Sequence, residues 1–339
     1  MNYRLFGKSG LRVSELCLGT MTFGTEWGWG ADKDESKKIF DAYAEAGGNF
    51  LDTANRYTEG TSERFLGEFI KSERHHFVLA TKFTLRDQPG DPNFAGNHRK
   101  NMMRSVEESL RRLDTEFIDL LWVHAWDGVT PVDEVLRGLD DLVRSGKVHY
   151  IGISDTPAWV ISQANTIAEL RGWNAFAGLQ IEYSLLQRTP ERELLPMAKH
   201  FGLAVTPWGA LGGGALTGKY LKGESGRVVE ASKRRSDRAN EIAAIVVETA
   251  KKMGVQPGPL AINWCRQRDP ELVSIPIIGA RSAAQLQDSL GCLDFQIPTD
   301  VLETLDAASA VEMGFPHEML SSENILELMF GGVYAKFNR

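Results

Sequence analysis

Residues 49–57 read N-F-L-D-T-A-N-R-Y, and this segment predicts where a functional site lies. Its apolar pair suits a short buried strand, Asp52 stands where that strand ends, and Tyr57 follows in a loop. Two further apolar runs also end at a polar residue, the first at Lys82 and the second at His124. We therefore interpret the rest of the chain as a frame that brings these four side chains together at the ends of three successive strands.

Outward from this stretch, short apolar runs alternate with amphipathic stretches. A β-hairpin is predicted over residues 3–13, and about eight strand-then-helix units follow it. Most of the runs are continuous and apolar, as strands buried on both faces of a parallel sheet are. Eight such units in 339 residues predict an α/β fold, a single (β/α)8 (TIM) barrel domain over residues 1–339. The tail, residues 310–339, is expected over the active-site face; packing under a subunit contact is the alternative.

A doubly wound sheet is the main rival fold. It predicts Gly-x-Gly-x-x-Gly directly after the first strand, and the sequence contains no such motif. The barrel also accounts for the position of the four polar residues, because barrel enzymes take their catalytic groups from the carboxyl ends of different strands.

Composition excludes several functions. A net charge of −7 argues against nucleic-acid binding, and no apolar run is long enough to cross a membrane. Three widely spaced cysteines predict reduced thiols in a cytoplasmic protein, and neither they nor His75-His76 have metal-ligand spacing. Oligomeric state is left open, as monomer or homo-oligomer.

The four residues suit the reduction of a carbonyl group. A phenol titrates at about 10, and a nearby ammonium, here Lys82, is expected to lower that value. Asp52 would hold Lys82 charged, and His124 would donate to the substrate oxygen. The hydride must come from a cofactor, because no side chain carries one.

Two loops suit a phosphate-bearing cofactor. Residues 208–219 read W-G-A-L-G-G-G-A-L-T-G-K, and glycines allow backbone amides to approach a phosphate closely. Residues 278–282 read I-G-A-R-S and open a helix, whose N-terminus favours anions. Barrel enzymes often bind phosphate with the loops after strands seven and eight.

The sequence resembles the aldo-keto reductase family over nearly its whole length, and most of all the aryl-alcohol dehydrogenase branch. The segments that carry this resemblance, in order, are L-D-T-A-N-R-Y (51–57), A-T-K-F (80–83), L-L-W-V-H-A-W-D (120–127), G-K-V-H-Y-I-G-I-S-D (146–155), Q-I-E-Y-S-L-L (180–186) and P-I-I-G-A-R-S (276–282).

The resemblance implies NADPH bound across the barrel mouth. It implies Tyr57 as general acid, tuned by Lys82 and Asp52, with His124 orienting the carbonyl. It implies cofactor contacts from Gly19, Thr20, Asp52, Ser154, Asp155, Gln180, Trp208, Gly209, Ala210, Leu211, Gly214, Leu216, Lys219, Gly279, Arg281, Gln285 and Ser289. The chain departs from the family in having Asp155 for a common Asn, Gly209-Ala210 for Ser-Pro, and Ser289 where an adenine-contacting Asn is frequent.

The substrate pocket is expected to be aromatic, with Trp27, Trp29 and Trp126 in mouth loops beside Tyr57 and His124. The leading function is reduction of a small aldehyde or ketone with NADPH. One alternative is an NADP(H)-binding regulatory subunit of the channel β-subunit type. Another is an aldolase that uses Lys82 as a Schiff-base amine. A purely structural role, in which Asp52 and Lys82 are only a buried ion pair, also stays open.

Overall fold

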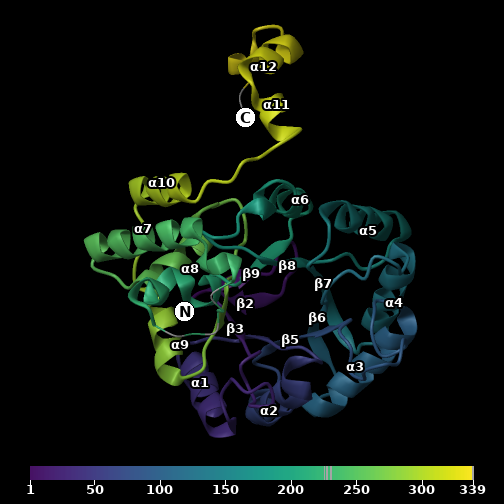
Figure 1. The fold of residues 1–339 in the computed structure, drawn as a ribbon. Coiled ribbons are helices and arrows are strands. Elements are labelled where there is room, and N and C mark those ends of the chain that lie inside the picture. Colours follow the sequence, from purple (N-terminus) through teal and green to yellow (C-terminus); the bar gives the residue numbers. More distant parts are fainter. Residues whose placement is uncertain (225, 227, 230, 338–339) are drawn as a thin grey trace.

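Parallel strands form a closed ring at the centre of the molecule (Figure 1). The computed structural model describes residues 1–224, 226, 228–229 and 231–337. The strands lie in the order β10-β3-β4-β5-β6-β7-β8-β9. Their bounds are β3 Cys17–Gly19, β4 Phe50–Asp52, β5 Val78–Phe83, β6 Ile118–Val123, β7 Val148–Ser154, β8 Gly178–Glu182, β9 Ala204–Trp208 and β10 Ile277–Gly279.

The ring closes between β9 and the segment before β10. Val205 donates its N–H to the carbonyl of Val273 and accepts from the N–H of Ile275, both at 2.8 Å. On its other side β10 pairs in parallel with β3. The predicted (β/α)8 barrel is therefore confirmed, although the expected strand at residues 273–278 is regular only from Ile277.

Helices surround the strands, and each of them contributes buried apolar side chains to the hydrophobic core (Figure 1). Their bounds are α1 Lys33–Glu45, α2 Thr61–Ile70, α3 Arg99–Leu113, α4 Val132–Arg144, α5 Ala158–Arg171, α6 Leu194–Phe201, α7 Asp237–Met253, α8 Pro257–Gln267, α9 Ala283–Leu290 and α10 Thr299–Ala308.

The predicted N-terminal hairpin is present, with β1 at Tyr3–Leu5 antiparallel to β2 at Arg12–Ser14. Phe6, which follows β1, is fully buried inside the barrel. Its ring meets those of Phe50 and Trp122 edge-on, at centroid distances of 5.7 and 6.1 Å. Since these residues lie on strands of the ring, the hairpin closes the amino-terminal end and leaves the carboxyl end as the open mouth.

The expected position of the C-terminal tail is wrong. Helices α11 (His317–Ser321) and α12 (Glu323–Phe330) extend outward beyond α6 and α10 and do not cover the mouth (Figure 1). Among described residues, nothing beyond Ser289 lines the mouth cavity. A polar contact holds the start of the tail in this position: Arg192 Nε donates to the carbonyl of Glu312 at 3.0 Å. Residues 338–339 of the predicted tail lie outside the described part.

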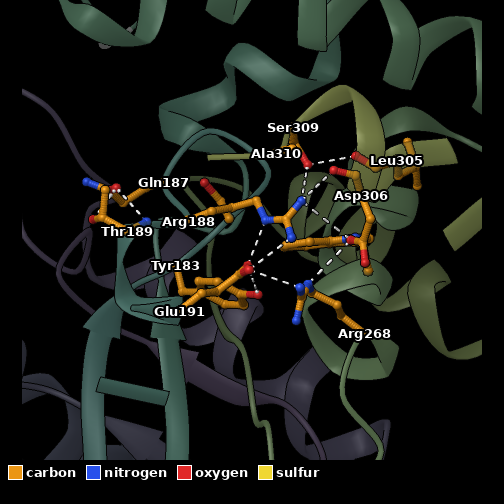
Figure 2. A network of polar contacts seen from close by, with 12 residues as sticks. Tyr183, Gln187, Arg188, Thr189, Glu191, Arg268, Leu305, Asp306, Ser309 and Ala310 are labelled. Atoms are coloured by element: carbon orange, nitrogen blue, oxygen red, sulfur yellow. Dashed lines mark hydrogen bonds and ion pairs between the residues drawn. The ribbon is translucent and has the colours of Figure 1, made fainter. Parts of the chain in front are cut away.

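A buried polar network fixes the base of this tail to the barrel (Figure 2). Arg188 donates through Nε to Glu191 Oε1 at 2.6 Å, and through Nη1 to the carbonyl of Asp306 and to Ser309 Oγ at 2.7 and 2.9 Å. Glu191 also accepts from Arg268 and from the hydroxyl of Tyr183. The network thus joins the loop after β8, the end of α8 and the end of α10.

Replacing Arg188 by Met should lower the free energy of unfolding by about 3 kcal/mol, because it removes one partner of a buried ion pair. Arg192→Met is the matched control: this arginine is half-buried and its contact with the carbonyl of Glu312 is exposed, so its loss should cost no more than about 1 kcal/mol. Urea denaturation of both variants measures the difference. Equal stabilities would show that the Arg188 network contributes no more than a surface contact.

Candidate active site

The structure brings Asp52, Tyr57 and Lys82 into direct contact at the barrel mouth. Lys82 lies inside β5 with only 1% of its side chain exposed. Its Nζ donates to Asp52 Oδ2 at 2.5 Å, to the carbonyl of Thr53 at 2.7 Å and to the Tyr57 hydroxyl at 3.1 Å. The second oxygen of Asp52 accepts from Gln180 Nε2 at 2.9 Å. All three donor positions of the ammonium are therefore used, one of them on the tyrosine.

The pKa values of this group differ from the sequence expectation in one respect. Burial raises the pKa of Tyr57 above the ordinary phenol value, and the nearby Lys82 ammonium only partly opposes this effect. Burial also acts to lower the pKa of Lys82, but Asp52 and Tyr57 outweigh it and the net change is upward. At neutral pH the pair is thus a protonated phenol beside an ammonium, which is the state of a proton donor.

His124 directly follows β6 and stands beside Tyr57, with ring centroids 5.9 Å apart and planes at 82°. Burial, with a contribution from Lys82, holds the pKa of His124 well below its usual range. The imidazole is therefore neutral at physiological pH. Within the described chain its Nδ1 is buried without a hydrogen-bond partner. A neutral ring next to the phenol can orient an oxygen atom without adding charge.

The backbone after Tyr57 is unusual. Thr58 and Glu59 both have positive φ angles, 45° and 55°, although neither is glycine. Thr58 is buried, and its Oγ1 donates to the carbonyl of Phe23 at 2.6 Å. This contact with the loop after β3 stabilises the strained turn. Strain of this kind is characteristic of sites where a side chain must be aimed, here the hydroxyl of Tyr57.

A large cavity of about 840 Å³ opens from this cluster. Most of the predicted site residues line it. These are Gly19, Trp27, Trp29, Asp52, Tyr57, His124, Ser154, Asp155, Gln180, Trp208, Gly209, Ala210, Leu211, Gly214, Lys219, Gly279, Arg281, Gln285 and Ser289.

Four predicted residues lie outside the cavity wall. Thr20 is fully buried and donates to the carbonyl of Asp52 at 3.0 Å. Leu216 belongs to the hydrophobic core, and Trp126 packs against that core from a half-buried position. Lys82 is also absent from the wall because it lies beneath Tyr57 and Asp52. Their spacing in the sequence identified the correct loops but not the side of each loop that faces the cavity.

Further lining residues were not singled out from the sequence, although Gly213, Thr217 and Ile278 belong to the two loops predicted to bind phosphate. They are Met21, Thr22, Arg56, Leu85, Gly213, Thr217, Arg234, Ile262, Ile277, Ile278, Ala284 and Asp288. A signal existed for two of them. Arg56 directly precedes Tyr57, and Arg234 lies in a run of basic residues. In the structure the Arg234 guanidinium pairs with Glu182 at the end of β8.

One end of the cavity fits a phosphate-bearing cofactor. Gly213 and Gly214, in the loop after β9, have φ angles of 69° and 93°. The φ angle of Gly214 favours glycine, and a Cβ there would stand 2.7 Å from Lys219 Cε and displace the end of that lysine. Arg281 is exposed just before α9, whose first turn is capped by Ser282. Cations and a helix N-terminus at one end of a cavity suit phosphate groups.

Two negative findings apply to the described ranges. No helix there is long and apolar enough to cross a membrane. No group of three or more His, Cys, Asp or Glu side chains in those ranges is arranged to hold a metal ion.

The protein has a (β/α)8 barrel with an Asp–Lys–Tyr–His cluster at the carboxyl ends of its strands. This is where barrel enzymes have their active sites, so the protein has the architecture of a barrel enzyme. Residues 15–310 match the aldo/keto reductase family. An aryl-alcohol dehydrogenase [NADP(+)] of Phanerodontia chrysosporium is 35% identical over 331 residues, which cover 91% of this chain and 86% of the relative. Norsolorinic acid reductase of Emericella nidulans is 37% identical over 325 residues, covering 92% and 82%. A putative aryl-alcohol dehydrogenase of Saccharomyces cerevisiae is 34% identical over 333 residues, covering 93% and 88%.

The chain belongs to the aldo-keto reductase family and is an oxidoreductase of that family. The resemblance noted in the sequence is thereby confirmed.

Proposed function

We propose that the protein reduces an aldehyde or ketone to the alcohol with NADPH, and that Tyr57 supplies the proton. The observation that carries this proposal is the Tyr57 hydroxyl, held 3.1 Å from Lys82 Nζ and open to the large cavity. When bound, the nicotinamide supplies the hydride that the carbonyl carbon takes up. The relative named for NADP(+) supports the choice of cofactor.

In this proposal the protein contributes position and a proton. His124 and Tyr57 are both neutral and together hold the carbonyl oxygen by hydrogen bonds. These bonds stabilise the negative charge that develops on the oxygen. As that oxygen becomes basic, the phenol gives up its proton, and the Lys82 ammonium stabilises the phenolate that remains. Asp52 keeps Lys82 in place and charged. A small carbonyl compound is thus the expected binding partner.

The substrate side of the cavity is aromatic. The rings of Trp27 and Trp29 lie 5.7 Å apart, and Trp27 meets the Tyr57 ring edge-on at 6.4 Å. Aromatic walls stabilise flat apolar ligands by stacking and burial. We therefore infer that carbonyl compounds with an aromatic ring are the preferred class, as the names of the aryl-alcohol dehydrogenase relatives suggest.

The direct test follows NADPH oxidation with a panel of aromatic and aliphatic aldehydes and ketones, with NADH in parallel. Turnover that is fastest with aromatic carbonyls and with NADPH supports the proposal. Tight NADPH binding without turnover of any carbonyl would instead indicate an NADP(H)-binding regulatory protein. Trapping of a substrate on Lys82 by borohydride would indicate the aldolase.

Replacing Arg281 by Ala should weaken NADPH binding by about 10- to 100-fold and NADH binding far less, because a charge-assisted contact to the 2′-phosphate contributes roughly 1.5–3 kcal/mol. Equilibrium titration with each cofactor measures both dissociation constants. Arg171→Ala, at the end of α5, is a control that should change neither. Equal weakening of both cofactors by Arg281→Ala would remove this residue from the 2′-phosphate site.

A further inference from the structure

Asp155 follows β7 directly and puts a carboxylate on the cavity wall. Its φ angle is 41°, in the left-handed region that aspartate tolerates better than most residues. The backbone there is held on two sides, because its N–H donates to the carbonyl of Gln180 at 3.3 Å and its own carbonyl accepts from Trp126 at 3.4 Å. The backbone that carries this exposed side chain is therefore fixed by the fold.

The carboxylate is held over the wall by one neighbour. Trp208, at the end of β9, donates its indole N–H to Asp155 Oδ1 at 3.3 Å. In the ranges that the structure describes, Asp155 has no ion-pair partner. Of the other acids on this wall, Asp52 is paired with Lys82, and Asp288 lies on α9 at the phosphate end. Arg234, a cation of the wall, is paired with Glu182. Asp155 thus contributes a negative charge that has no ion-pair partner among the described residues and that the Lys82 ammonium offsets only in part.

This charge lies where the ring of the proposed cofactor must go. The cations of the phosphate end, Lys219 and Arg281, follow β9 and β10, whereas Tyr57 follows β4 across the mouth. Asp155 itself lies close to the reacting group. Its N–H donates to the carbonyl of Gln180, whose side chain donates to Asp52, and its charge acts to raise the pKa of Tyr57. A nicotinamide ring placed to deliver a hydride beside Tyr57 is therefore near the Asp155 carboxylate.

We propose that the Asp155 carboxylate biases the bound cofactor toward its oxidised form, NADP⁺. The inference rests on the proposed function. The nicotinamide ring carries a positive charge when oxidised and none when reduced, whereas the phosphates of the two forms are the same. A fixed negative charge beside the ring attracts only the oxidised form, and a partly enclosed site weakens the screening of that attraction. Burial raises the pKa of Asp155 above the usual aspartate value, as expected for a carboxylate that lacks a cation.

The test measures binding and requires no turnover. Dissociation constants for NADP⁺ and for NADPH are determined by fluorescence titration for the wild type and for Asp155→Asn. We expect the substitution to raise the ratio of the NADP⁺ constant to the NADPH constant about tenfold, a change of about 1.4 kcal/mol. Trp208→Phe, which removes the hydrogen bond but keeps the charge, should leave that ratio near the wild-type value.

Asp288→Asn is the matched control for loss of a negative charge. Asp288 also lines the cavity, but on α9 beside the phosphate end, so its loss should change both affinities in the same direction and keep their ratio. An unchanged ratio in Asp155→Asn, or equal weakening of both forms, would overturn the proposed bias while leaving the cofactor assignment intact. Failure of the wild type to bind either form would overturn the proposed function and this inference with it.

Discussion

Tyr57→Phe should lose turnover by about 10²- to 10⁴-fold and keep its affinity for NADPH, because the substitution removes only the proton donor. The phenyl ring still fills the space beside His124 and Trp27, whose rings it meets edge-on. The variant removes one acceptor of Lys82 Nζ, which retains Asp52 and the carbonyl of Thr53. The loss should therefore appear in kcat, and steady-state kinetics together with cofactor titration separate the two effects.

Tyr150→Phe provides the matched control. Tyr150 is a half-buried tyrosine on β7, two positions into the strand and remote from the cavity wall. Its substitution should leave kcat within about twofold. If Tyr57→Phe turned over as fast as this control, the proton would have to come from another group and the proposed mechanism would be wrong.

Lys82→Met should lower the free energy of unfolding by about 3–5 kcal/mol and also abolish most turnover, because it leaves the Asp52 carboxylate buried without its cation. Asp52 has 3% of its side chain exposed, so water cannot replace the ammonium. Its remaining donor from a side chain is Gln180 Nε2. Chemical denaturation measures the loss of stability, and the kinetic assay measures the loss of turnover.

The double variant Asp52→Asn/Lys82→Met tests the cause. Because it removes both charges, it should recover about 2 kcal/mol relative to Lys82→Met while remaining inactive. Lys199→Met is the control for an exposed ion pair, since Lys199 is 40% exposed beside Asp269 and Glu271, and it should cost less than about 1 kcal/mol. A Lys82→Met protein as stable as the Lys199 variant would contradict the buried-pair account.

The barrel and the position of the cluster could be predicted from the sequence because both depend on local patterns. The apolar runs of parallel strands are continuous, and Asp52 and His124 stand where such runs end. The ends of parallel strands meet at one face, so residues that are far apart in the chain were correctly expected together. The proposed chemistry was inferred from the types of these residues and stays a prediction.

Other features depend on tertiary contacts that spacing does not encode. Thr20 and Leu216 lie in the predicted loops but face the protein interior. The rise in the pKa of Tyr57 follows from how deeply the folded chain buries it, which outweighs the Lys82 charge that the sequence analysis considered. The left-handed backbone at Thr58 has no sequence signal, because a β-branched residue normally avoids it. The tail resembled a cover because its residues are apolar, yet Phe315 and Leu328 are 81% and 72% exposed.

The Arg188 network also determines how the molecule would carry a mechanical load. A pull on the C-terminus passes along the exposed tail to Ser309 and Asp306, which Arg188 holds against the barrel (Figure 2). The exposed contact of Arg192 with Glu312 would break first, and the buried arginine would resist next. Because the tail leaves the barrel away from the mouth, a protein tethered to a surface by this end would keep its cavity open to solution.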